Sequence, residues 1–529
     1  MDLQEKRILD SVHGNIYIDK QLVENIIDTP EFQRLRRVEQ TSTRSIFPSA
    51  RHDRFIHSLG VYYIGTLISK QLEKTGLKII LDSIAEGLFA NISTAYHIAC
   101  LLHDIGHAPF SHTFEKYFGS FPINVGSKDQ LKNDVLVSIR NLYNENDTPQ
   151  IQEDELFNIR CDSNYHELTS ALVTINEFND IIPTSLTAYN NTEFVARMII
   201  GCAYQHEKDN IEVQLRNCFI NLLHGGIIDA DRLDYVCRDV WASGYCTSSV
   251  DIERLISGLY IEKDPSTNEY EVCFHANVLN EIESVLDVKD FQVKYILNHH
   301  SVLLEQYYLE QAALKMALHF TNLPNEHDEE KALSSILCKE ALSKNGVVLN
   351  KIIIDSQGPI TIKHMADDDL INLIKLDNND FYQKWSSRRY DKVALWKTRD
   401  EFFYYFSLPR ITSFGDKQEF VDTIIPVLSN FGFALEDILF LKAEYKPRVE
   451  LDTLKIYFPT QKMINYTQLY RENDYAQEEK DKQKVKTQIF YYVYLDSKKL
   501  PDTKEELISF KMEIMRALRK AIESKYNNT

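Results

Sequence analysis

The sequence lacks the cysteine pairs and long apolar runs that mark several classes of protein. Its eight cysteines are scattered, without a Cys-x-x-Cys pair, which excludes a cysteine-rich zinc module and fits reduced thiols better than a disulfide framework. No stretch approaches the roughly 18 apolar residues that a membrane helix needs. The first residues also lack the apolar core of a secretory signal. We therefore expect a cytoplasmic protein with no membrane partner.

Basic residues are fewer than acidic ones, and prolines and glycines are scarce. The formal net charge of −19 argues against a protein that coats nucleic acid, although a locally basic pocket could still bind phosphates. Nucleic acid is therefore not an expected partner. Only 14 prolines and 17 glycines occur in 529 residues, and apolar residues recur at helical spacing, so the sequence predicts a mainly α fold. It contains neither a glycine-rich phosphate loop nor an internal repeat.

The length exceeds that of a usual single domain, which favours one large domain with a smaller one appended. Helical spacing continues to about residue 400. Residues 487–495 then alternate β-branched and aromatic side chains, and an amphipathic helix is predicted near 503–525. We predict a large helical domain over residues 1–400 and a small α+β region over residues 401–529.

The most informative stretch is residues 99–114, where an apolar helical run ends in histidines and an acid. His103 and Asp104 are adjacent near the end of the helix, which Gly106 and Pro109 then break. An imidazole and a carboxylate held together are good ligands for a hard or borderline divalent cation. Taken alone, such a pair is more often a hydrogen-bonded helix end than a metal site.

Other charged or polar segments fit either a structural or a functional role. Thr29 and Pro30 predict the start of a helix over residues 31–40, whose arginines either form a solvated face or meet phosphates. His57 begins a further helix, and a lone histidine is more often structural than a ligand. His166 is followed by glutamate without a second histidine four residues later, which excludes a metalloprotease helix.

A second acidic cluster occupies residues 226–239. On a helix, Asp231, Tyr235 and Asp239 fall at four-residue steps on one face. On pattern alone, this stripe fits the lining of a pocket and a salt-bridged helix surface equally well.

The order of these elements, His57, His103-Asp104, His166 and Asp231, resembles the HD superfamily of metal-dependent phosphohydrolases. The sequence that flanks these residues looks like that of the deoxynucleoside triphosphate triphosphohydrolases. This resemblance covers roughly residues 7–400 and is carried by five segments, residues 10–14, 27–36, 54–61, 102–112 and 229–235. It implies a mainly α fold in which an HD-domain helical core precedes the α+β appendage.

The resemblance implies that four residues hold a divalent metal, which is Mg²⁺, Mn²⁺ or Fe²⁺: His57, His103, Asp104 and Asp231. Two imidazoles and two carboxylates leave positions open for water and a phosphate oxygen, which suits a catalytic site. The family pattern also implies that His112, with Glu115 as its carboxylate partner, protonates the departing oxygen. It further implies that two other histidines, His107 and His166, contact the phosphates during catalysis.

For the substrate, the resemblance places Arg54 and Arg232 on the triphosphate, Tyr235 against the deoxyribose, and Gln40 and Asp239 on the 3′-hydroxyl. Arginine stands at 232 where the family more often has lysine. Its planar fork imposes another geometry on a bound phosphate.

The resemblance also implies regulation. Asp28, Gln33 and Arg36 occupy the places at which regulated members hold an activator nucleotide at a subunit junction, so we expect a homo-oligomer. Family members lower cellular deoxynucleotide pools, and some thereby restrict viruses or phages, which implies a role in antiviral defence.

Two other functions stay open. An HD phosphodiesterase or nuclease would act on cyclic nucleotides or single-stranded nucleic acid. A non-catalytic nucleotide-binding regulator would need no complete ligand set, and the four intact ligands argue against it.

Overall fold

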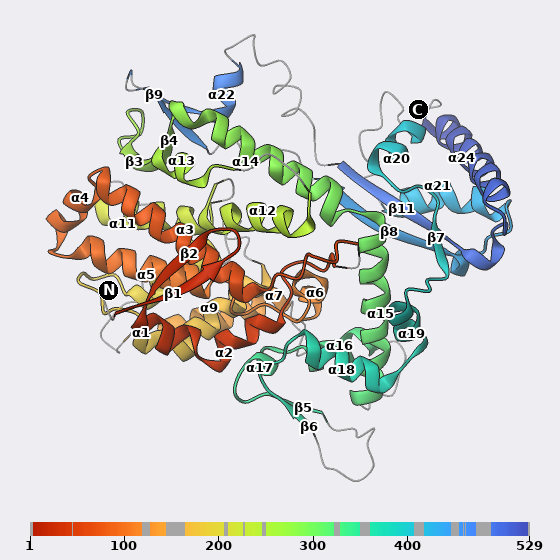
Figure 1. Ribbon diagram of the computed structural model, residues 1–529, viewed down its shortest axis with the longest axis horizontal. Coiled ribbons are helices and arrows are strands. Elements are labelled where there is room, and N and C mark those ends of the chain that lie inside the picture. Colours follow the sequence, from red (N-terminus) through yellow and green to blue (C-terminus); the bar gives the residue numbers. More distant parts are fainter. Residues whose placement is uncertain are drawn as a thin grey trace. The chain divides into compact units, whose positions relative to one another are not determined.

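The computed structural model contains two compact units (Figure 1). Unit 1 comprises residues 1–289, 312–379 and 450–469, and unit 2 comprises residues 290–311, 380–449 and 470–529. The predicted mainly helical class is confirmed. The structure describes residues 4–44, 46–118, 127–143, 164–205, 210–225, 228–245, 250–321, 328–349, 360–406, 417–445, 454–458, 460, 462–471 and 488–526.

Unit 1 begins with an antiparallel hairpin of β1 (Glu5–Asp10) and β2 (Gly14–Asp19). Gly14, at φ +74°, makes the turn in a region of backbone conformation that favours glycine. Ile16 and Ile18 are buried beneath the hairpin, and β2 packs on α3. The hairpin therefore lies against the helix that carries His57.

Three helix ends position the central residues of unit 1. The Asp53 side chain accepts the backbone N–H of Ile56 at the start of α3 (Arg54–Lys74), and Asp229 accepts that of Arg232 at the start of α12 (Ala230–Ser243). The helix α5 (Leu88–Leu102) ends directly before His103. α3 packs on both α5 and α12, so the three ends meet.

The predicted helix at residues 31–40 is shorter than expected. α2 (Pro30–Gln33) continues as a 3₁₀ turn over Arg34–Arg37, and Val38 is extended. Thr29 caps the start as predicted, because its hydroxyl accepts the backbone N–H of Phe32.

The strands that follow in unit 1 form a four-stranded sheet in the order β10-β9-β4-β3. Its strands are β3 (Leu259–Lys263), β4 (Tyr270–His275), β9 (Lys455–Phe458) and β10 (Lys462–Asn465).

Unit 2 is built on an antiparallel sheet in the order β7-β11-β8. The alternating stretch near residue 490 forms β11, and the predicted terminal helix forms α24. Trp396 is fully buried in the aromatic core that joins this sheet to its helices. The elements are β7 (Lys392–Ala394), β8 (Ile438–Tyr445), β11 (Gln488–Asp496), α20 (Arg399–Phe406), α21 (Lys417–Ser429) and α24 (Lys504–Tyr526).

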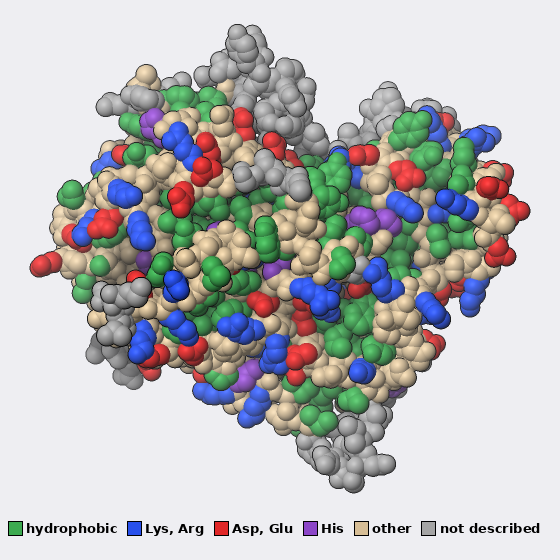
Figure 2. Space-filling model, in the orientation of Figure 1, with side chains coloured by type: hydrophobic (Ala, Val, Ile, Leu, Met, Phe, Trp, Pro, Cys, Tyr) green, Lys and Arg blue, Asp and Glu red, His purple; other side chains and the backbone are tan. Residues whose placement is uncertain are grey.

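The remaining elements complete the two units, and α15 runs from one unit into the other. Figure 2 shows acidic and basic side chains interspersed over the described part of the visible face. Among the described helices, none is both long and apolar enough to cross a membrane. The remaining longer helices are α4 (Leu77–Ile84), α7 (Ser127–Arg140), α9 (Tyr165–Phe178), α10 (Asn191–Ile200), α11 (Ile211–Leu223), α13 (Ile252–Ser257), α14 (Leu279–Phe291), α15 (His300–Thr321), α16 (Glu329–Ile336), α18 (Asp367–Asp377), α19 (Asp380–Ser387) and α22 (Tyr466–Arg471). The short elements are α1 (Lys20–Leu22), α6 (Glu115–Phe118), α17 (Lys339–Leu342), β5 (Val347–Leu349) and β6 (Ile360–Ile362).

Candidate metal centre

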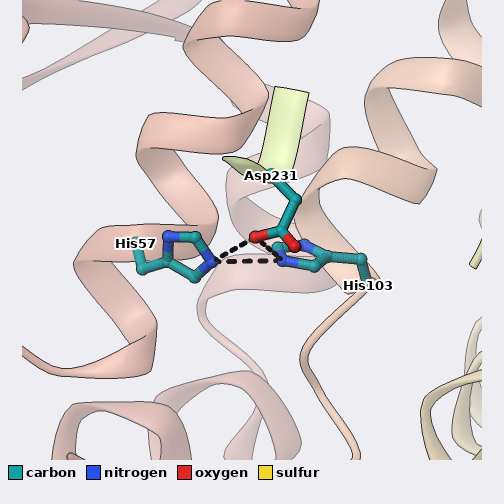
Figure 3. A group of neighbouring side chains, drawn as sticks. All are labelled: His57, His103 and Asp231. Carbon is teal, nitrogen blue, oxygen red and sulfur yellow. Dashed lines mark hydrogen bonds and ion pairs between the residues drawn. The ribbon is translucent and has the colours of Figure 1, made fainter. Parts of the chain in front are cut away.

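Two imidazoles and a carboxylate meet where the ends of α3, α5 and α12 converge (Figure 3). The His57 Nε2 atom lies 3.0 Å from Asp231 Oδ1 and 3.3 Å from His103 Nε2. His103 Nε2 lies 3.5 Å from the same Asp231 oxygen. The three side chains, which come from positions far apart in the sequence, thus point their donor atoms at one place.

Asp104 adds a fourth donor to this group. Its Oδ2 atom lies 3.4 Å from His57 Nε2 and 3.5 Å from His103 Nε2. Donor atoms that bind one ion at about 2.1 Å are spaced by about 3.0–3.4 Å in tetrahedral or octahedral geometry. The observed spacings to the histidine nitrogens match these values, so His57, His103 and Asp231 fit a single divalent cation, and Asp104 lies beside both imidazoles.

The second ring nitrogen of each histidine is already engaged by an acceptor. His57 Nδ1 lies 2.7 Å from Asp234 Oδ2, and His103 Nδ1 lies 2.9 Å from the backbone oxygen of Cys100. Because both partners accept hydrogen bonds, each ring donates from Nδ1 and turns Nε2 toward the centre. This is the arrangement that metal-binding histidines need.

The electrostatics of the centre favour positive charge. Burial alone would lower the pKa of His57, but its hydrogen bonds with Asp231 and Asp234 and the charge of Asp104 raise that pKa to about 10. Burial would likewise raise the pKa of Asp231, yet hydrogen bonds with His103 and His57 hold it below its usual range. The carboxylates are therefore charged and available as ligands.

Asp234 belongs to a buried network that ties the N-terminal hairpin to the centre. Its Oδ1 atom lies 2.6 Å from His13 Nε2, and the guanidinium of Arg238 donates to both of its oxygens at 2.8 Å. Arg238 also donates to Asp10 Oδ2 at 2.8 Å. Since Asp234 holds His57, the network fixes the orientation of a candidate ligand.

Gly60 makes room for this network. A Cβ atom at position 60 would lie 1.9 Å from Asp234 Oδ1 and 2.5 Å from Arg238 Nη2. A side chain there would displace the pair. Sequence reasoning did not foresee the roles of Asp234, Arg238, Asp10 and His13, although Asp10, His13 and Asp234 lie in the segments that carry the family resemblance.

A second cluster of histidines joins the centre through Asp104. Glu115 bridges two rings, since its Oε2 lies 2.6 Å from His112 Nδ1 and its Oε1 lies 2.7 Å from His166 Nδ1. His107 stacks on His166 with ring centroids 4.0 Å apart and places Nε2 3.2 Å from Asp104 Oδ1. The structure thus brings together the four residues for which sequence analysis predicted catalytic roles.

Glu115 also determines the charge of this cluster. Burial would lower the pKa of His166, but its hydrogen bond with Glu115 raises it to about 9. Burial would raise the pKa of Glu115, and its bonds to His112 and His166 instead lower it well below the usual range. The side chain of His112 is 64% exposed, so this ring is the member of the cluster that solvent and ligands can reach.

The two arginines predicted to bind the triphosphate differ in accessibility. Arg54 is buried and donates to Asp104 Oδ2 at 2.5 Å and to Ser111 Oγ at 3.0 Å, so it holds a candidate ligand in place. Arg232 is partly exposed and donates from Nε to the Tyr235 hydroxyl at 3.0 Å. It lies on the helix that supplies Asp231.

The two residues predicted to bind the 3′-hydroxyl, Gln40 and Asp239, each form a hydrogen bond with His52. Asp239 Oδ1 is 2.6 Å from His52 Nε2, and the backbone N–H of Gln40 donates to the His52 carbonyl oxygen at 3.1 Å. The Gln40 side chain is buried, and its Oε1 has no hydrogen-bond partner among the described residues. Sequence reasoning missed His52, which no metal or phosphate motif marks.

The predicted regulatory residues lie outside the metal cluster. The Gln33 amide donates to the Ile27 carbonyl at 2.7 Å and accepts from Arg36 Nε at 2.9 Å, while the Arg36 guanidinium lies 3.5 Å from the centre of the Phe55 ring. Asp28 is exposed, with Lys6 Nζ at 3.9 Å.

Arg34 has neither of the roles considered for this arginine cluster. It is fully buried and donates to the carbonyl oxygens of Ile105 and His107 at 2.8 and 2.9 Å. Asp367 accepts the backbone N–H of Phe110 at 2.6 Å on the same loop. These two side chains hold the loop that follows the His103-Asp104 pair.

Comparisons with known proteins agree with this geometry. Residues 54–153 match the HD domain family. The chain is 25% identical over 311 residues to the uncharacterized protein MJ1154 of Methanocaldococcus jannaschii, which covers 59% of this chain and 49% of that protein. Over 110 residues, 21% of this chain and 17% of the relative, it is 44% identical to the deoxynucleoside triphosphate triphosphohydrolase SAMHD1 of Gallus gallus. In fold it is similar to a phosphohydrolase from Bacteroides thetaiotaomicron, with a TM-score of 0.54 and 18% identity over 93% of this chain and all of that one.

The chain spans about half the length of two of the curated relatives that it matches, including the Methanocaldococcus protein. The matched HD region contains His57, His103 and Asp104, and Asp231 reaches the same point from outside it. Residues 54–153 are therefore similar to an HD domain, and three of the four residues of the predicted ligand set lie in this region.

Proposed function

We propose that the protein hydrolyses deoxynucleoside triphosphates to deoxynucleoside and inorganic triphosphate. The observation that carries the proposal is the cluster of His57, His103 and Asp231, with the Asp231 and Asp104 carboxylates each 3.0–3.5 Å from the two histidine nitrogens. The similarity over 110 and 114 residues to two proteins named as deoxynucleoside triphosphate triphosphohydrolases supports the substrate class.

The donor set fits Mg²⁺, Mn²⁺ or Fe²⁺, because it combines imidazole nitrogen with carboxylate oxygen. When bound, such an ion supplies Lewis-acid activation of water and of a phosphoryl group. The residues of the chain orient the ligands: Asp234 orients the His57 ring, the Cys100 carbonyl orients the His103 ring, and Arg54 holds Asp104.

The proposed reaction breaks the bond between the α-phosphorus and the 5′-oxygen. Water supplies the new oxygen on phosphorus, and the departing 5′-oxygen takes up a proton. His112 is the proton donor in this scheme, because it is exposed and Glu115 holds its ring through a hydrogen bond at Nδ1. His107 and His166 stack beside Asp104 and would contact the phosphates.

Selectivity for a deoxyribose is assigned to α12. Tyr235 follows Asp231 by one helical turn, and its hydroxyl accepts from Arg232. The ring would pack on a sugar and leave little room for a 2′-hydroxyl, while Arg232 would neutralise phosphate. Gln40 and Asp239 are the proposed contacts of the 3′-hydroxyl.

Regulation by a second nucleotide is proposed for Asp28, Gln33 and Arg36, in a homo-oligomer. A carboxylate accepts from a guanine edge, and an arginine meets phosphates or stacks on a base. Lowering of deoxynucleotide pools would connect this activity to antiviral defence.

A product screen tests the proposed function. The full chain, loaded in turn with Mg²⁺, Mn²⁺ and Fe²⁺, is incubated with each dNTP, with ATP, with cyclic dinucleotides and with a single-stranded oligonucleotide. The proposal predicts deoxynucleoside and inorganic triphosphate, with dATP cleaved faster than ATP. Cleavage confined to cyclic dinucleotides or oligonucleotides would replace it with a phosphodiesterase or nuclease, and binding without turnover under all metals would indicate a regulator.

A further inference from the structure

A cavity of about 430 Å³ lies in unit 1 on the side of α12 away from Asp231. Val236 and Val240 line it, and at 100° per residue they lie on a different face of the helix from Asp231 and Tyr235. Its size falls within the roughly 300–1,000 Å³ usual for small-molecule sites. None of the residues proposed to bind metal or substrate lines it.

The lining combines aromatic rings with acids. Tyr63, Trp241 and Tyr245 contribute the rings, and Asp251 and Glu253 the carboxylates. The Trp241 side chain is 56% exposed, which leaves its ring accessible. Burial raises the pKa of Tyr63, and the charge of Glu253 raises it further, so this carboxylate acts on the ring that lines the cavity.

The charge of the lining selects among ligands. Among the described residues, the lining of the cavity includes two carboxylates and neither a lysine nor an arginine. The two carboxylates would repel a phosphate group, and no described lysine or arginine of the lining would neutralise it, so the cavity does not suit a nucleotide. Aromatic faces and carboxylates together attract an organic cation, through cation–π contact and charge.

One wall of the cavity is part of the network behind the metal centre. His13 lines the cavity and packs on Tyr63, with ring centroids 5.2 Å apart. On its other side, His13 Nε2 lies 2.6 Å from Asp234, which holds His57 at 2.7 Å. Only two hydrogen bonds separate the cavity wall from a candidate metal ligand.

We propose that this cavity binds a small aromatic amine, and that its occupation strengthens metal binding by restraining His13 and, through Asp234, His57. The binding is independent of the proposed function, whereas the coupling rests on the metal centre. A ligand that favours the ring orientation needed for metal binding must in turn bind more tightly when metal is present, because such coupling is reciprocal.

Three indole compounds of different charge test the binding. Calorimetry of the full chain compares tryptamine, which is cationic, with neutral tryptophol and anionic indole-3-acetate. We expect tryptamine to bind at least about 5-fold more tightly than tryptophol, and indole-3-acetate to bind most weakly. Equal affinity for the three compounds, or tightest binding of the anion, would overturn the proposal.

Matched variants locate the site. Trp241→Ala and Glu253→Gln are each expected to weaken tryptamine binding by about 3- to 5-fold. The controls are Tyr404→Ala and Glu505→Gln, which change an exposed aromatic ring and an exposed acid of unit 2, and they should leave the affinity unchanged. Tryptamine binding that neither cavity variant weakens would place the ligand elsewhere and overturn the assignment.

Metal titrations test the coupling without reference to catalysis. Saturating tryptamine should lower the Kd for Mn²⁺ by about 5-fold. His13→Asn should abolish this change while retaining tryptamine binding within about 3-fold. If the Kd for Mn²⁺ is the same with and without tryptamine in the wild-type chain, the coupling is refuted, and the product screen above still decides the proposed function separately.

Discussion

Asp234 and His57 form a buried hydrogen bond of 2.7 Å, on the side of the imidazole ring opposite to Asp231. The bond fixes the tautomer that turns Nε2 toward the candidate metal centre. Asp234 is itself held by Arg238 and His13, so the orientation of one ligand depends on residues from the N-terminal hairpin and from α12.

The first prediction concerns this bond. Asp234→Asn should weaken Mn²⁺ binding about 10- to 100-fold, because an amide cannot accept from His57, His13 and Arg238 at once. Isothermal titration measures the affinity, and circular dichroism shows whether the variant is folded. The control is Asp502→Asn, an exposed acid of unit 2. Unchanged Mn²⁺ affinity in folded Asp234→Asn protein would contradict the role of this residue.

The second prediction concerns the pH dependence of stability. Glu115 raises the pKa of His166 to about 9, above the value of about 6.5 in an unfolded chain. On the alkaline side, the stabilisation of the folded state by the Glu115–His166 pair is therefore complete at about pH 6.5 and is lost as the pH rises through 9. It is also lost in acid, since the pKa of Glu115 is lowered on folding.

Glu115→Gln removes this pair. Urea unfolding should show a difference in the free energy of unfolding from wild type of about 2 kcal/mol at pH 6, which shrinks toward zero at pH 10. Glu505→Gln, an exposed change in α24, should show no such trend. A wild-type to Glu115→Gln difference of the same size at both pH values would refute the assigned pairing.

The third prediction separates proton donation from metal binding. His112→Gln should lower kcat for a dNTP about 10²- to 10⁴-fold, because the departing oxygen loses its proton donor. Hydrolysis of bis-p-nitrophenyl phosphate should fall far less, since its leaving group needs no proton. Mn²⁺ affinity should be unchanged. An equal loss on both substrates would assign His112 another role.

The fourth prediction concerns the proposed regulatory site. Rates measured with each dNTP alone and in pairs should differ by roughly 5- to 150-fold if an activator nucleotide is needed. Arg36→Ala should remove that activation, whereas Arg51→Ala, an exposed arginine that donates to a nearby carbonyl, should not. Light scattering follows the mass of the assembly. Equal cleavage of every dNTP alone, with no effect of Arg36→Ala, would exclude this site.

The sequence was most informative where one local pattern implied one arrangement. Adjacent His103 and Asp104 after an apolar helical run, with His57 and Asp231 in family order, led to a predicted ligand set whose donor atoms lie within 3.5 Å of the histidine nitrogens in the structure. Helical periodicity was likewise sufficient for the mainly α class. Both rest on short-range spacing, which a sequence displays directly.

Long-range pairings could not be foreseen in this way. Asp10 and Arg238 are separated by 228 positions, and neither belongs to a metal motif. The linear division at residue 400 also differs from the compact units, because residues 290–311 belong to unit 2 while β9 returns to pair in parallel with β4 in unit 1. Such contacts depend on tertiary packing, which periodicity does not report.

The position of the bond that breaks distinguishes release of triphosphate from the other possible reactions. The wild-type chain is loaded with Mn²⁺ and incubated with dGTP in ¹⁸O-water, and the products are identified by ³¹P NMR and mass spectrometry. We expect unlabelled deoxyguanosine and inorganic triphosphate that carries one ¹⁸O on a terminal phosphorus, with no turnover by Asp231→Asn. Label in orthophosphate, pyrophosphate or a deoxynucleoside monophosphate, or unchanged turnover by Asp231→Asn, would contradict this expectation.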